Sequence, residues 1–250
     1  MTVNGRNVLV TAGAKHLGAA IVEAFAKRGA NSAINYRNSR QEAVALAEQL
    51  RARYGGNHIV LQADVAKKED VTRMINEAES RLGSVDVLVN NAGPFSKTPF
   101  TEMAENEWDE VLDSNLKAAY LCAAAAAPAM RRRGWGRIVN VSAVSAFVRN
   151  RSIYGLSKAA MHTLTESLAL ELAPEVTVNA IAPGQILESL QEMSGIDQSW
   201  AESVTARTPL GRLVTRQEVA DIVVELCAET FDMVTGVVVP IDGGLRIPRF

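Results

Sequence analysis

The stretch Asn7-Val-Leu-Val-Thr11-Ala-Gly-Ala-Lys-His-Leu-Gly18 is the clearest indication of the fold. A short apolar run from Asn7 to Thr11 enters a turn of small residues and then the amphipathic stretch Leu17 to Arg28. That pattern predicts a buried strand, a tight turn and a helix. In such a turn, backbone amides approach a phosphate group at the helix N-terminus. The glycine pattern alone is a weak signal, and it gains weight from the strand and the helix on either side.

The alternation of strand and helix continues along the chain. Further apolar runs predict strands over Ser32 to Asn35, His58 to Gln62, Val85 to Val89, Arg137 to Val141, Thr177 to Ile181 and Val237 to Ile241. Amphipathic stretches predict helices over Arg40 to Tyr54, Glu69 to Leu82, Glu105 to Arg132, Ile153 to Leu172 and Arg216 to Ala228. We therefore expect an α/β fold, a single Rossmann-type doubly wound domain over residues 1–250, with a seven-stranded parallel sheet and helices on both faces.

Composition excludes several classes of protein. The net charge is −2, with 26 basic and 28 acidic residues, which provides no field for nucleic acid or an anionic membrane. The two cysteines, Cys122 and Cys227, lie far apart in apolar helical patterns, and no secretory leader or run of membrane length is found, so we expect a reduced, cytoplasmic protein. The histidines His16, His58 and His162 lack metal-ligand spacing, so no metal site is expected.

The end of the second predicted strand indicates the coenzyme. A dinucleotide fold that recognises a ribose 2′-hydroxyl carries Asp or Glu about 20 residues beyond the turn, whereas arginine there accommodates a 2′-phosphate. This chain reads Asn35-Tyr36-Arg37 at that place, with no acid before Glu42, and Lys15 adds a second cation in the turn. We therefore predict NADP(H), with Arg37 as the principal contact; a solvated loop arginine is the alternative.

Tyr154 and Lys158 lie four residues apart in a predicted helix, which places both side chains on one face. A tyrosine with its ordinary pKa of about 10 is a poor acid or base near neutrality. A lysine charge about 6 Å away at an effective dielectric of about 20 favours the phenolate by roughly 2.8 kcal/mol, or about 2 pKa units. The pair therefore predicts an acid–base tyrosine, although an ordinary half-exposed helix pair would have the same spacing.

With the other motifs in order, the chain resembles the short-chain dehydrogenase/reductase family over essentially its whole length. The motifs are the glycine turn, Asp64-Val65, Asn90-Asn91-Ala92-Gly93, Asn115, a serine after the fifth strand, Tyr154 and Lys158, Pro183-Gly184 and Asp242-Gly243-Gly244. The resemblance implies that Tyr154 is the catalytic acid/base and that Lys158 binds the nicotinamide ribose and lowers the tyrosine pKa. It also implies that Asn115 anchors a water-borne proton relay. Hydride would pass from the coenzyme to an electrophilic carbon while Tyr154 protonates the oxyanion.

The resemblance also gives a set of coenzyme contacts, in which Asp64 and Val65 hold the adenine and Asn91 to Gly93 back the coenzyme. The full expected set is Thr11, Gly13, Lys15, His16, Leu17, Gly18, Tyr36, Arg37, Asp64, Val65, Asn91, Ala92, Gly93, Tyr154, Lys158, Pro183, Gly184 and Ile186. The position of Asn91 to Gly93 agrees with this role, because open sheets bind ligands at the carboxyl ends of their strands. Asn115 interrupts a helical pattern, where a local helix distortion or a solvent-facing side chain is as good an interpretation.

The glycine turn departs from the family pattern. Its first glycine is Ala12 and its middle glycine is His16, so the phosphate cradle must accommodate a Cβ atom and an imidazole. The pteridine-reductase branch also has a bulky basic residue at the middle site. We expect His16 either beside the phosphates or pointing to solvent.

The serine that orients the substrate carbonyl is ambiguous. Counting forward from the fifth strand places the family serine at Ala143, whereas counting back from Tyr154 leaves Ser142 one residue short of the usual separation. A small deletion within residues 146–152 would reconcile the two counts. Neighbouring residues of an extended chain point to opposite faces, so one position matters. Ser142 is the preferred candidate, Ser145 the second, and a site without any serine the third.

The substrate is less well indicated. Phe95 is similar in position to the aromatic residue on which pteridine reductases stack a pterin, although a core or rim phenylalanine is the slightly favoured interpretation. Together with Phe95, we predict Ser145 and Gln185 as substrate contacts. Arg149 and Arg151 would suit an anionic substrate, but two arginines beside a loop are more often solvated. Residues 185–208 predict a mobile lid with an apolar underside, formed by Leu187, Leu190, Met193, Ile196 and Trp200.

Three functions from different classes fit these features. The first is an NADPH-dependent carbonyl reductase similar to 3-oxoacyl-carrier-protein reductases, acting on a 3-oxoacyl thioester or a ketone. The second is a pteridine-type or enoyl reductase acting on a C=N or C=C bond. The third is a coenzyme-binding regulator without turnover, since a fold does not fix a function. The family resemblance implies a homotetramer or homodimer, and the alanines at Ala118, Ala119 and Ala123 to Ala127 allow close helix packing either there or within the chain.

Overall fold

The computed structural model describes residues 3–148, 152–192 and 198–247. Within them, seven strands form one sheet in the order β3-β2-β1-β4-β5-β6-β7, and every neighbouring pair is parallel. The strands are β1 (Asn7–Val10), β2 (Asn31–Tyr36), β3 (His58–Gln62), β4 (Val87–Asn90), β5 (Gly136–Val141), β6 (Val176–Pro183) and β7 (Val238–Ile241). The predicted doubly wound parallel sheet is confirmed.

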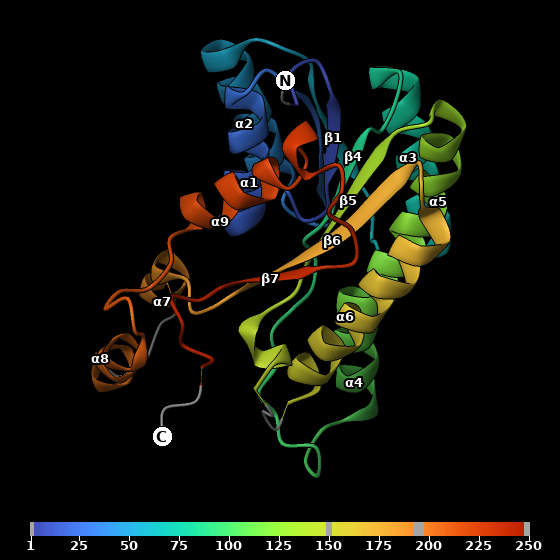
Figure 1. Cartoon of the computed structure of the whole chain (residues 1–250). Helices are drawn as coiled ribbons and strands as arrows, with labels where there is room; N and C mark the ends of the chain where they lie inside the picture. The colour runs from blue at the N-terminus through green and yellow to red at the C-terminus, as the bar shows by residue number, and fades with distance from the viewer. Residues whose placement is uncertain (1–2, 149–151, 193–197, 248–250) are drawn as a thin grey trace.

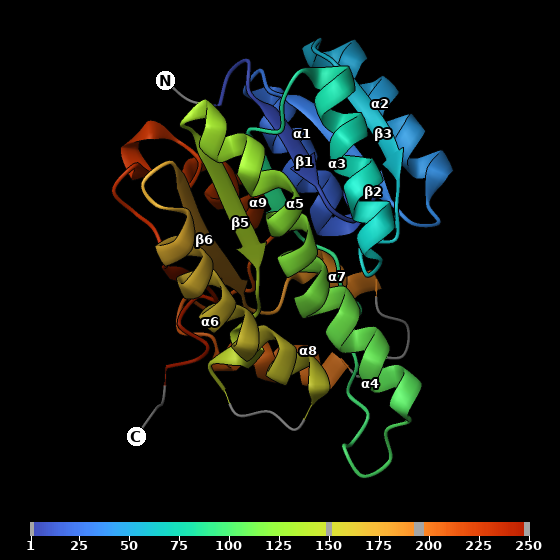
Figure 2. The same cartoon turned by 90° about the vertical axis from the view of Figure 1, so that its right-hand side faces the viewer.

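Helices cover both faces of the sheet (Figures 1 and 2). They are α1 (His16–Lys27), α2 (Arg40–Tyr54), α3 (Lys68–Leu82), α4 (Glu105–Leu112), α5 (Ala118–Arg133), α6 (Ile153–Leu172), α7 (Leu187–Glu192), α8 (Gln198–Arg207) and α9 (Arg216–Glu225). Short turns η1 (Asp113–Lys117), η2 (Val144–Ala146) and η3 (Glu229–Phe231) complete the described elements. No helix among the described residues is long and apolar enough to cross a membrane.

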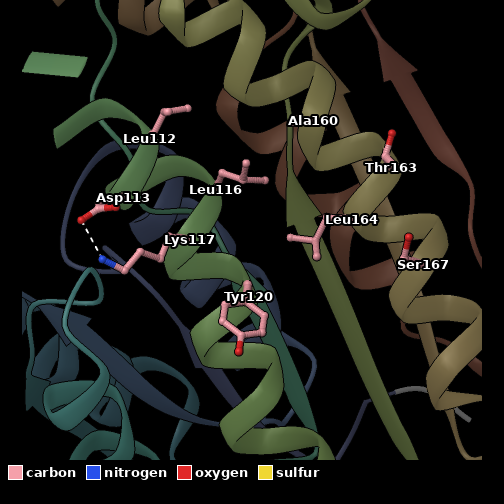
Figure 3. Close-up of a pocket in the computed structure, with 9 residues that line it drawn as sticks. All are labelled: Leu112, Asp113, Leu116, Lys117, Tyr120, Ala160, Thr163, Leu164 and Ser167. Carbon is pink, nitrogen blue, oxygen red and sulfur yellow. Dashed lines mark hydrogen bonds and ion pairs between the residues drawn. The ribbon is translucent and has the colours of Figure 1, made fainter. Parts of the chain in front are cut away.

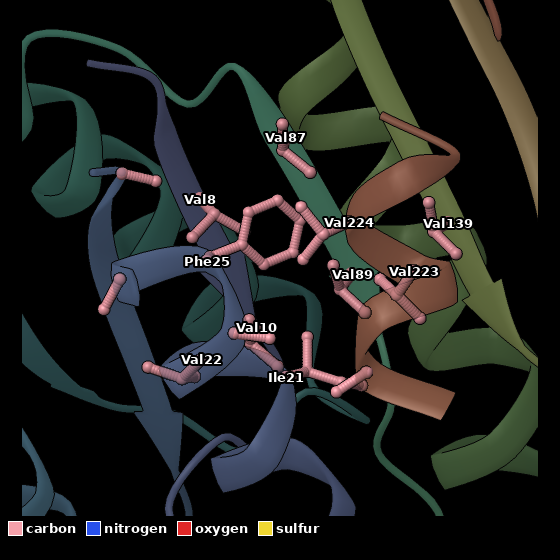
Figure 4. Close-up of a cluster of buried hydrophobic side chains, with 14 of the residues drawn as sticks. Val8, Val10, Ile21, Val22, Phe25, Val87, Val89, Val139, Val223 and Val224 are labelled. Carbon is pink, nitrogen blue, oxygen red and sulfur yellow. The ribbon is translucent and has the colours of Figure 1, made fainter. Parts of the chain in front are cut away.

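Two hydrophobic cores form on opposite faces of the sheet because neighbouring strand residues point to opposite sides. On one face, Val8 and Val10 of β1 pack with Phe25 of α1 and Val224 of α9 (Figure 4). On the other face, Leu9 packs in the cluster that includes residues of α3, α5 and α6. Strands that are buried on both faces explain why the sequence shows continuous apolar runs.

The order of the strands reverses between β1 and β4, which lie side by side at the centre of the sheet. The connections that follow these two strands leave toward opposite halves of the sheet, so a crevice opens at their carboxyl ends. Ligands of doubly wound folds bind at this switch point. The topology therefore supports the position at which the sequence predicts the coenzyme.

One predicted helix differs in detail. The stretch Glu105 to Arg132 was expected to be a single helix, but α4 and α5 are joined by the π-helical segment η1. Most of the alanines named above face the interior: Ala118, Ala119, Ala123, Ala126 and Ala127 are buried within the chain. Helix packing inside the chain therefore accounts for these five alanines, and they are not an argument for assembly.

Candidate active site

The turn after β1 is fastened to the end of β4 by one threonine. Thr11 Oγ1 accepts hydrogen bonds from the backbone N–H groups of Asn91 at 2.9 Å and Ala92 at 3.0 Å. In return, Asn91 Nδ2 donates to the carbonyl oxygens of Thr11 at 3.1 Å and Ala12 at 3.3 Å. These bonds bring two segments that are about 80 residues apart into one rigid rim at the switch point.

Two non-glycine residues of the turn have left-handed backbone. Ala12 has φ of 49° and His16 has φ of 51°, the two positions at which the sequence departs from the family's glycines. This conformation costs an L-residue roughly 1–2 kcal/mol. Asn35 holds the backbone of the turn at Ala12. Its Oδ1 accepts from Ala12 N at 3.0 Å, and its backbone oxygen accepts from Gly13 N at 2.8 Å. Sequence reasoning missed Asn35, although a buried asparagine in a strand was a visible signal.

Gly18 allows α1 to approach the turn closely. A Cβ atom at Gly18 would lie 2.2 Å from the carbonyl oxygen of Ala12 and 2.8 Å from Asn91 Nδ2, so no larger residue fits. Gly13 is also confined, because its Cβ would lie 2.9 Å from the carbonyl oxygen of Val10. Leu17, between them in the sequence, is only partly buried and packs against the core. The turn is therefore built from backbone groups held at close range.

The two cations predicted to contact a 2′-phosphate both have acidic partners. Lys15 Nζ lies 2.5 Å from Glu42 Oε1, and Arg37 Nη2 lies 3.9 Å from Glu110 Oε1. The Lys15 partner holds the pKa of Glu42 below its ordinary value. Both cations are about half exposed, and such exposed pairs contribute little stability and can be exchanged for another anion. Tyr36, predicted beside Arg37, has its side chain buried in the core.

Asp64 and Val65, the expected adenine contacts, follow β3. Asp64 Oδ1 accepts from the backbone N–H of Ala66 at 3.1 Å, while Asp64 N donates to Asp70 Oδ2 at 2.9 Å. That bond lowers the pKa of Asp70. Val65 is buried. The two residues therefore form an ordered turn at the carboxyl end of β3.

Asn115 lies inside the π-helical segment and is buried. The alternative of a helix distortion is thus correct, and that of a solvent-facing side chain is wrong. Asn115 Nδ2 donates to the carbonyl oxygens of Pro94 at 2.9 Å and Val111 at 3.0 Å. Among the described residues, its Oδ1 atom has no hydrogen-bond partner although it is buried. Gly93 makes room for this amide, because a Cβ there would lie 2.1 Å from Asn115 Oδ1.

Tyr154 and Lys158 lie together on α6, as their spacing predicts. Lys158 Nζ is 5.4 Å from the centroid of the Tyr154 ring and donates to the carbonyl oxygen of Val141 at 2.8 Å. Burial lowers the pKa of Lys158 to about 7 and raises that of Tyr154 to about 12. The expected lowering of the tyrosine pKa is therefore wrong for this structure. Desolvation disfavours both charged forms, and it leaves Lys158 with much less charge than the Coulomb argument assumed.

Phe95 packs against Tyr154 with the ring centroids 5.1 Å apart and an interplanar angle of 72°. Its side chain is 59% exposed, so it belongs to the rim of the site and not to the core. An exposed aromatic face beside the Tyr154 phenol can contact a flat or apolar molecule.

The two candidate serines differ in how their hydroxyls are used. Ser142 Oγ donates to the carbonyl oxygen of Lys158 at 3.1 Å and lies 2.9 Å from His162 Nε2. Since a hydroxyl has one proton to donate, His162 must donate from Nε2 when Ser142 donates to Lys158. The Ser145 hydroxyl is buried and has no partner among the described residues. His162, which sequence reasoning left as a scattered histidine, therefore fixes Ser142 from α6.

Comparison with known proteins agrees with this geometry. A family profile described as enoyl-(acyl carrier protein) reductase matches residues 12–246. The 3-oxoacyl-[acyl-carrier-protein] reductase FabG of Staphylococcus aureus is 36% identical over 243 residues, which are 96% of this chain and 98% of that protein. The chain is a short-chain dehydrogenase/reductase. It is a carbonyl-reducing oxidoreductase that uses a nicotinamide coenzyme.

Solved structures resemble this short-chain dehydrogenase/reductase throughout. A 7α-hydroxysteroid dehydrogenase complexed with NADH and 7-oxo glycochenodeoxycholic acid has a TM-score of 0.91 at 28% identity, covering 97% of this chain and 95% of that one. L-sorbose reductase from Gluconobacter frateurii, complexed with NADPH and L-sorbose, has a TM-score of 0.90 at 29% identity and covers 99% of both chains. A structure with NADH and a structure with NADPH thus resemble this chain to a similar degree.

The segment after β6 is held by contacts with two later parts of the chain. Gly184, the residue after Pro183, packs closely against Asp242. A Cβ atom at Gly184 would lie 2.9 Å from Asp242 Cα. Ile186 pairs with Val214 in an isolated parallel bridge, and Gln185 Nε2 donates to the carbonyl oxygen of Ile186 at 3.5 Å.

The stretch predicted as a lid contains α7 and α8, and of the apolar residues named for its underside only Leu190 is buried among the described residues. Leu190 of α7 and Val204 of α8 pack with Leu213 in a small separate cluster. Leu187 and Trp200 are more than one-third exposed. The remaining lid positions, Met193 and Ile196, and the two arginines Arg149 and Arg151 lie outside the described residues.

The residues present fit a nicotinamide coenzyme. The turn after β1, Asn91 to Gly93 after β4, the serines after β5 and Pro183 at the end of β6 all lie at the carboxyl ends of neighbouring central strands. Two buried oxygens in this region, Asn115 Oδ1 and Ser145 Oγ, have no partner within the described chain. Orphaned polar atoms at a crevice indicate a place for water or ligand groups.

Proposed function

We propose that this enzyme reduces a 3-oxoacyl thioester or a ketone with NADPH in the cytoplasm, with Tyr154 as general acid. One observation carries the proposal. A buried lysine, Lys158, lies 5.4 Å from the ring centroid of Tyr154 at the open end of β5, and Phe95 provides an exposed apolar wall beside it. The relatives named as 3-oxoacyl reductases give the substrate class, and this chain is similar to them over nearly its whole length.

The bound coenzyme supplies the hydride in this chemistry. Tyr154 carries its proton at neutral pH, because burial raises the pKa of Tyr154 to about 12, and it can donate that proton to a developing alkoxide. Lys158 lies behind it with a pKa of about 7, where it can hold or release a proton at working pH. Asn115 is buried, its side-chain oxygen has no partner within the described chain, and in this proposal it anchors the water through which the proton is restored.

Ser145 is the better-placed carbonyl-orienting hydroxyl in this proposal. Its oxygen is buried and unpartnered among the described residues, so its proton is available to a substrate oxyanion. The hydroxyl of Ser142 is engaged with the Lys158 carbonyl and the His162 ring. Ser142 then keeps the loop before η2 against α6, and Phe147, whose ring centroid is 4.9 Å from that of His162, extends this packing.

NADPH is the proposed coenzyme because Arg37 follows β2 at the place where an acid would bind a 2′-hydroxyl. Lys15, in the turn after β1, is a second cation for a 2′-phosphate. Their present partners, Glu110 and Glu42, are exposed carboxylates, so a 2′-phosphate can replace them at small cost. The expected contacts with the coenzyme are those given by the sequence, with Thr11 and Asn35 fixing the turn that presents them.

Phe95 supports a second candidate, a pteridine-type or enoyl reductase. The ring is 59% exposed and lies edge-on to Tyr154, so a planar heterocycle can stack on it. The matching family profile also bears the description of an enoyl reductase.

A substrate panel separates these functions. We expect NADPH oxidation with β-ketoacyl thioesters or ketones, and weaker or no turnover with dihydropterin and enoyl thioesters. Turnover confined to dihydropterin or enoyl substrates would instead establish the second candidate. Tight binding of coenzyme with no oxidation by any substrate would indicate a coenzyme-binding regulator.

We further propose that the enzyme assembles as a homodimer or homotetramer through a groove between α4–α5 and α6. Figure 3 shows that Leu116 and Leu164 point toward each other across this groove, which Tyr120 also lines. Tyr120 is 51% exposed on an apolar surface, which a second copy of the same helix pair would cover.

A further inference from the structure

Arg216, the first residue of α9, holds an acidic side chain against the turn after β1. Its guanidinium forms a two-pronged ion pair with Glu192, the last residue of α7, with Nη1 2.7 Å from Oε1 and Nη2 bonded to Oε2. His16 Nδ1 lies 2.9 Å from Glu192 Oε2 and 3.2 Å from Arg216 Nη2. Three residues from three elements therefore meet at one point, which we call the Arg216 cluster.

The side chain of Arg216 is more buried than those of its partners. It is 14% exposed, whereas the side chains of Glu192 and His16 are 47% and 62% exposed. Its Nη2 atom also donates to Ser189 Oγ at 3.3 Å. The guanidinium is thus a fixed group, and the carboxylate is the partner that can leave into solvent.

Helix α7 does not depend on this ion pair for its place. The Glu188 carboxylate accepts from the backbone N–H of Arg216 at 3.1 Å, and the backbone N–H of Leu187 donates to the carbonyl oxygen of Val214 at 2.9 Å. These bonds fasten the first turn of α7 to the first residue of α9 and to the chain just before it, without using the guanidinium. Loss of the Glu192 contact would therefore free only the C-terminal end of α7.

The cluster lies at the turn that the proposed function assigns to the coenzyme's diphosphate. His16 opens α1 with left-handed backbone, and α9 packs beside α1 (Figure 1). A guanidinium fork binds a carboxylate and a phosphate with the same two parallel hydrogen bonds. Two anions cannot share it, because the Glu192 carboxylate and a diphosphate repel each other.

We propose that Arg216 is a binding residue for the diphosphate of the nicotinamide coenzyme and that Glu192 occupies its guanidinium until the coenzyme arrives. This inference rests on the proposed function for the location of the diphosphate. His16 remains beside Arg216 and lines the same anion site. The exchange of one anion for the other releases the C-terminal end of α7 at the moment of coenzyme binding.

Equilibrium binding to the wild type and three variants tests the exchange. Titration calorimetry would compare the wild type with Arg216→Met, Glu192→Gln and the double variant, with NADPH, inorganic diphosphate and adenosine 2′-monophosphate as ligands. Arg216→Met should weaken NADPH and diphosphate about tenfold, the loss expected of a charge-assisted hydrogen bond. Glu192→Gln should tighten both several-fold, because the competing anion is gone.

Two comparisons make the test specific. In the Arg216→Met background, Glu192→Gln should give no further tightening, since the group for which the two anions compete has been removed. Adenosine 2′-monophosphate, which has no diphosphate, should bind all variants alike. Glu171→Gln removes an exposed carboxylate from α6 and is the matched charge control, with no change expected for any ligand.

Several outcomes would overturn the inference: unchanged diphosphate affinity in Arg216→Met, unchanged affinity in Glu192→Gln, or equal tightening of adenosine 2′-monophosphate. Absence of diphosphate binding to the wild type would do the same. If Arg216→Met does not fold, Arg216→Lys keeps the charge without the fork and should still weaken diphosphate severalfold. Coenzyme binding that follows these expectations without turnover of any carbonyl substrate would overturn the proposed function and leave the Arg216 assignment intact.

Discussion

At the scale of single residues, the site depends on what burial does to two side chains. Tyr154 and Lys158 lie where their spacing places them, but burial raises the pKa of one and lowers that of the other. The phenol therefore starts as a proton donor and the amine is poised near neutrality. A helical spacing of four residues gives the proximity, and only the surroundings decide the protonation states.

Tyr154→Phe should abolish turnover and leave the affinity for coenzyme nearly intact. The substitution removes the acidic proton and keeps the ring that packs on Phe95. Loss of a positioned general acid lowers the rate by about 100- to 10,000-fold. Steady-state kinetics and coenzyme titration check this, and a substantial residual rate would assign the acid to another group.

Arg37→Asp should shift the coenzyme preference from NADPH toward NADH. The change removes the cation expected to bind a 2′-phosphate and supplies a carboxylate able to accept from a 2′-hydroxyl. The ratio of kcat/KM values for the two coenzymes measures the effect. Arg53→Asp, which removes an exposed arginine at the far end of α2, is the control. An unchanged ratio would withdraw the assignment of Arg37.

Lys158→Met should change how stability depends on pH. In the wild type the Lys158 pKa is about 7 when folded and 10.5 when unfolded, so between these values the unfolded chain binds the extra proton. Raising the pH through this window therefore stabilises the folded wild type by up to about 1.4 kcal/mol per pH unit, a gain that the variant lacks. Urea unfolding at pH 7, 8 and 9 should show that the variant becomes progressively less stable relative to the wild type as the pH rises. A constant difference would contradict this expectation.

At the scale of elements, the π-helical segment η1 and the loop after β4 fit each other. The extra residue in η1 turns Asn115 inward, and Gly93, with φ of 142°, leaves the space that the amide fills. π-Helical turns often mark functional sites. The periodicity of the sequence predicts a helix here, but it cannot distinguish a short π-helical segment from a continuous α-helix.

Gly93→Ala should therefore damage the site more than backbone strain alone predicts. Its Cβ would lie 2.1 Å from Asn115 Oδ1 and force the amide or the loop to move. Gly83→Ala is a matched control, since Gly83 also has positive φ, of 91°, but its added Cβ would have no neighbour within 4 Å. Both variants should lose roughly 1–2 kcal/mol from strain, with a greater loss and strongly reduced kcat only in Gly93→Ala. Chemical unfolding and kinetics measure both, and equal effects would show that Asn115 is not constrained by Gly93.

At the scale of the whole molecule, the doubly wound sheet assembles the site from segments spread over the chain. The turn after β1 and the ends of β4, β5 and β6 lie at the carboxyl edge of neighbouring strands, where Lys158 of α6 donates to the carbonyl oxygen of Val141. The groove beside α5 and α6 lies outside the crevice and is available for assembly (Figure 3).

Tyr120→Glu should dissociate the proposed oligomer without unfolding it. Tyr120 is 51% exposed in the isolated chain, so a charge there costs the monomer little but repels a second copy across an apolar interface. Analytical ultracentrifugation should show the mass falling toward that of one 26.9 kDa chain. Tyr54→Glu, at the end of α2, should leave the mass unchanged. A wild type that is already monomeric would contradict the proposal.

Local sequence was enough to predict the α/β class, the parallel sheet, most helix bounds to within a few residues, and the spacing of Tyr154 and Lys158. These properties depend on local periodicity and short-range geometry, which each segment carries alone. Four other features appear only in the folded chain: the protonation of this pair, the inward turn of Asn115, the different hydrogen bonding of Ser142 and Ser145 within the described residues, and the meeting of His16 with Glu192 and Arg216. Burial and contacts between distant segments set those features, because desolvation and partner geometry exist only once the chain has folded.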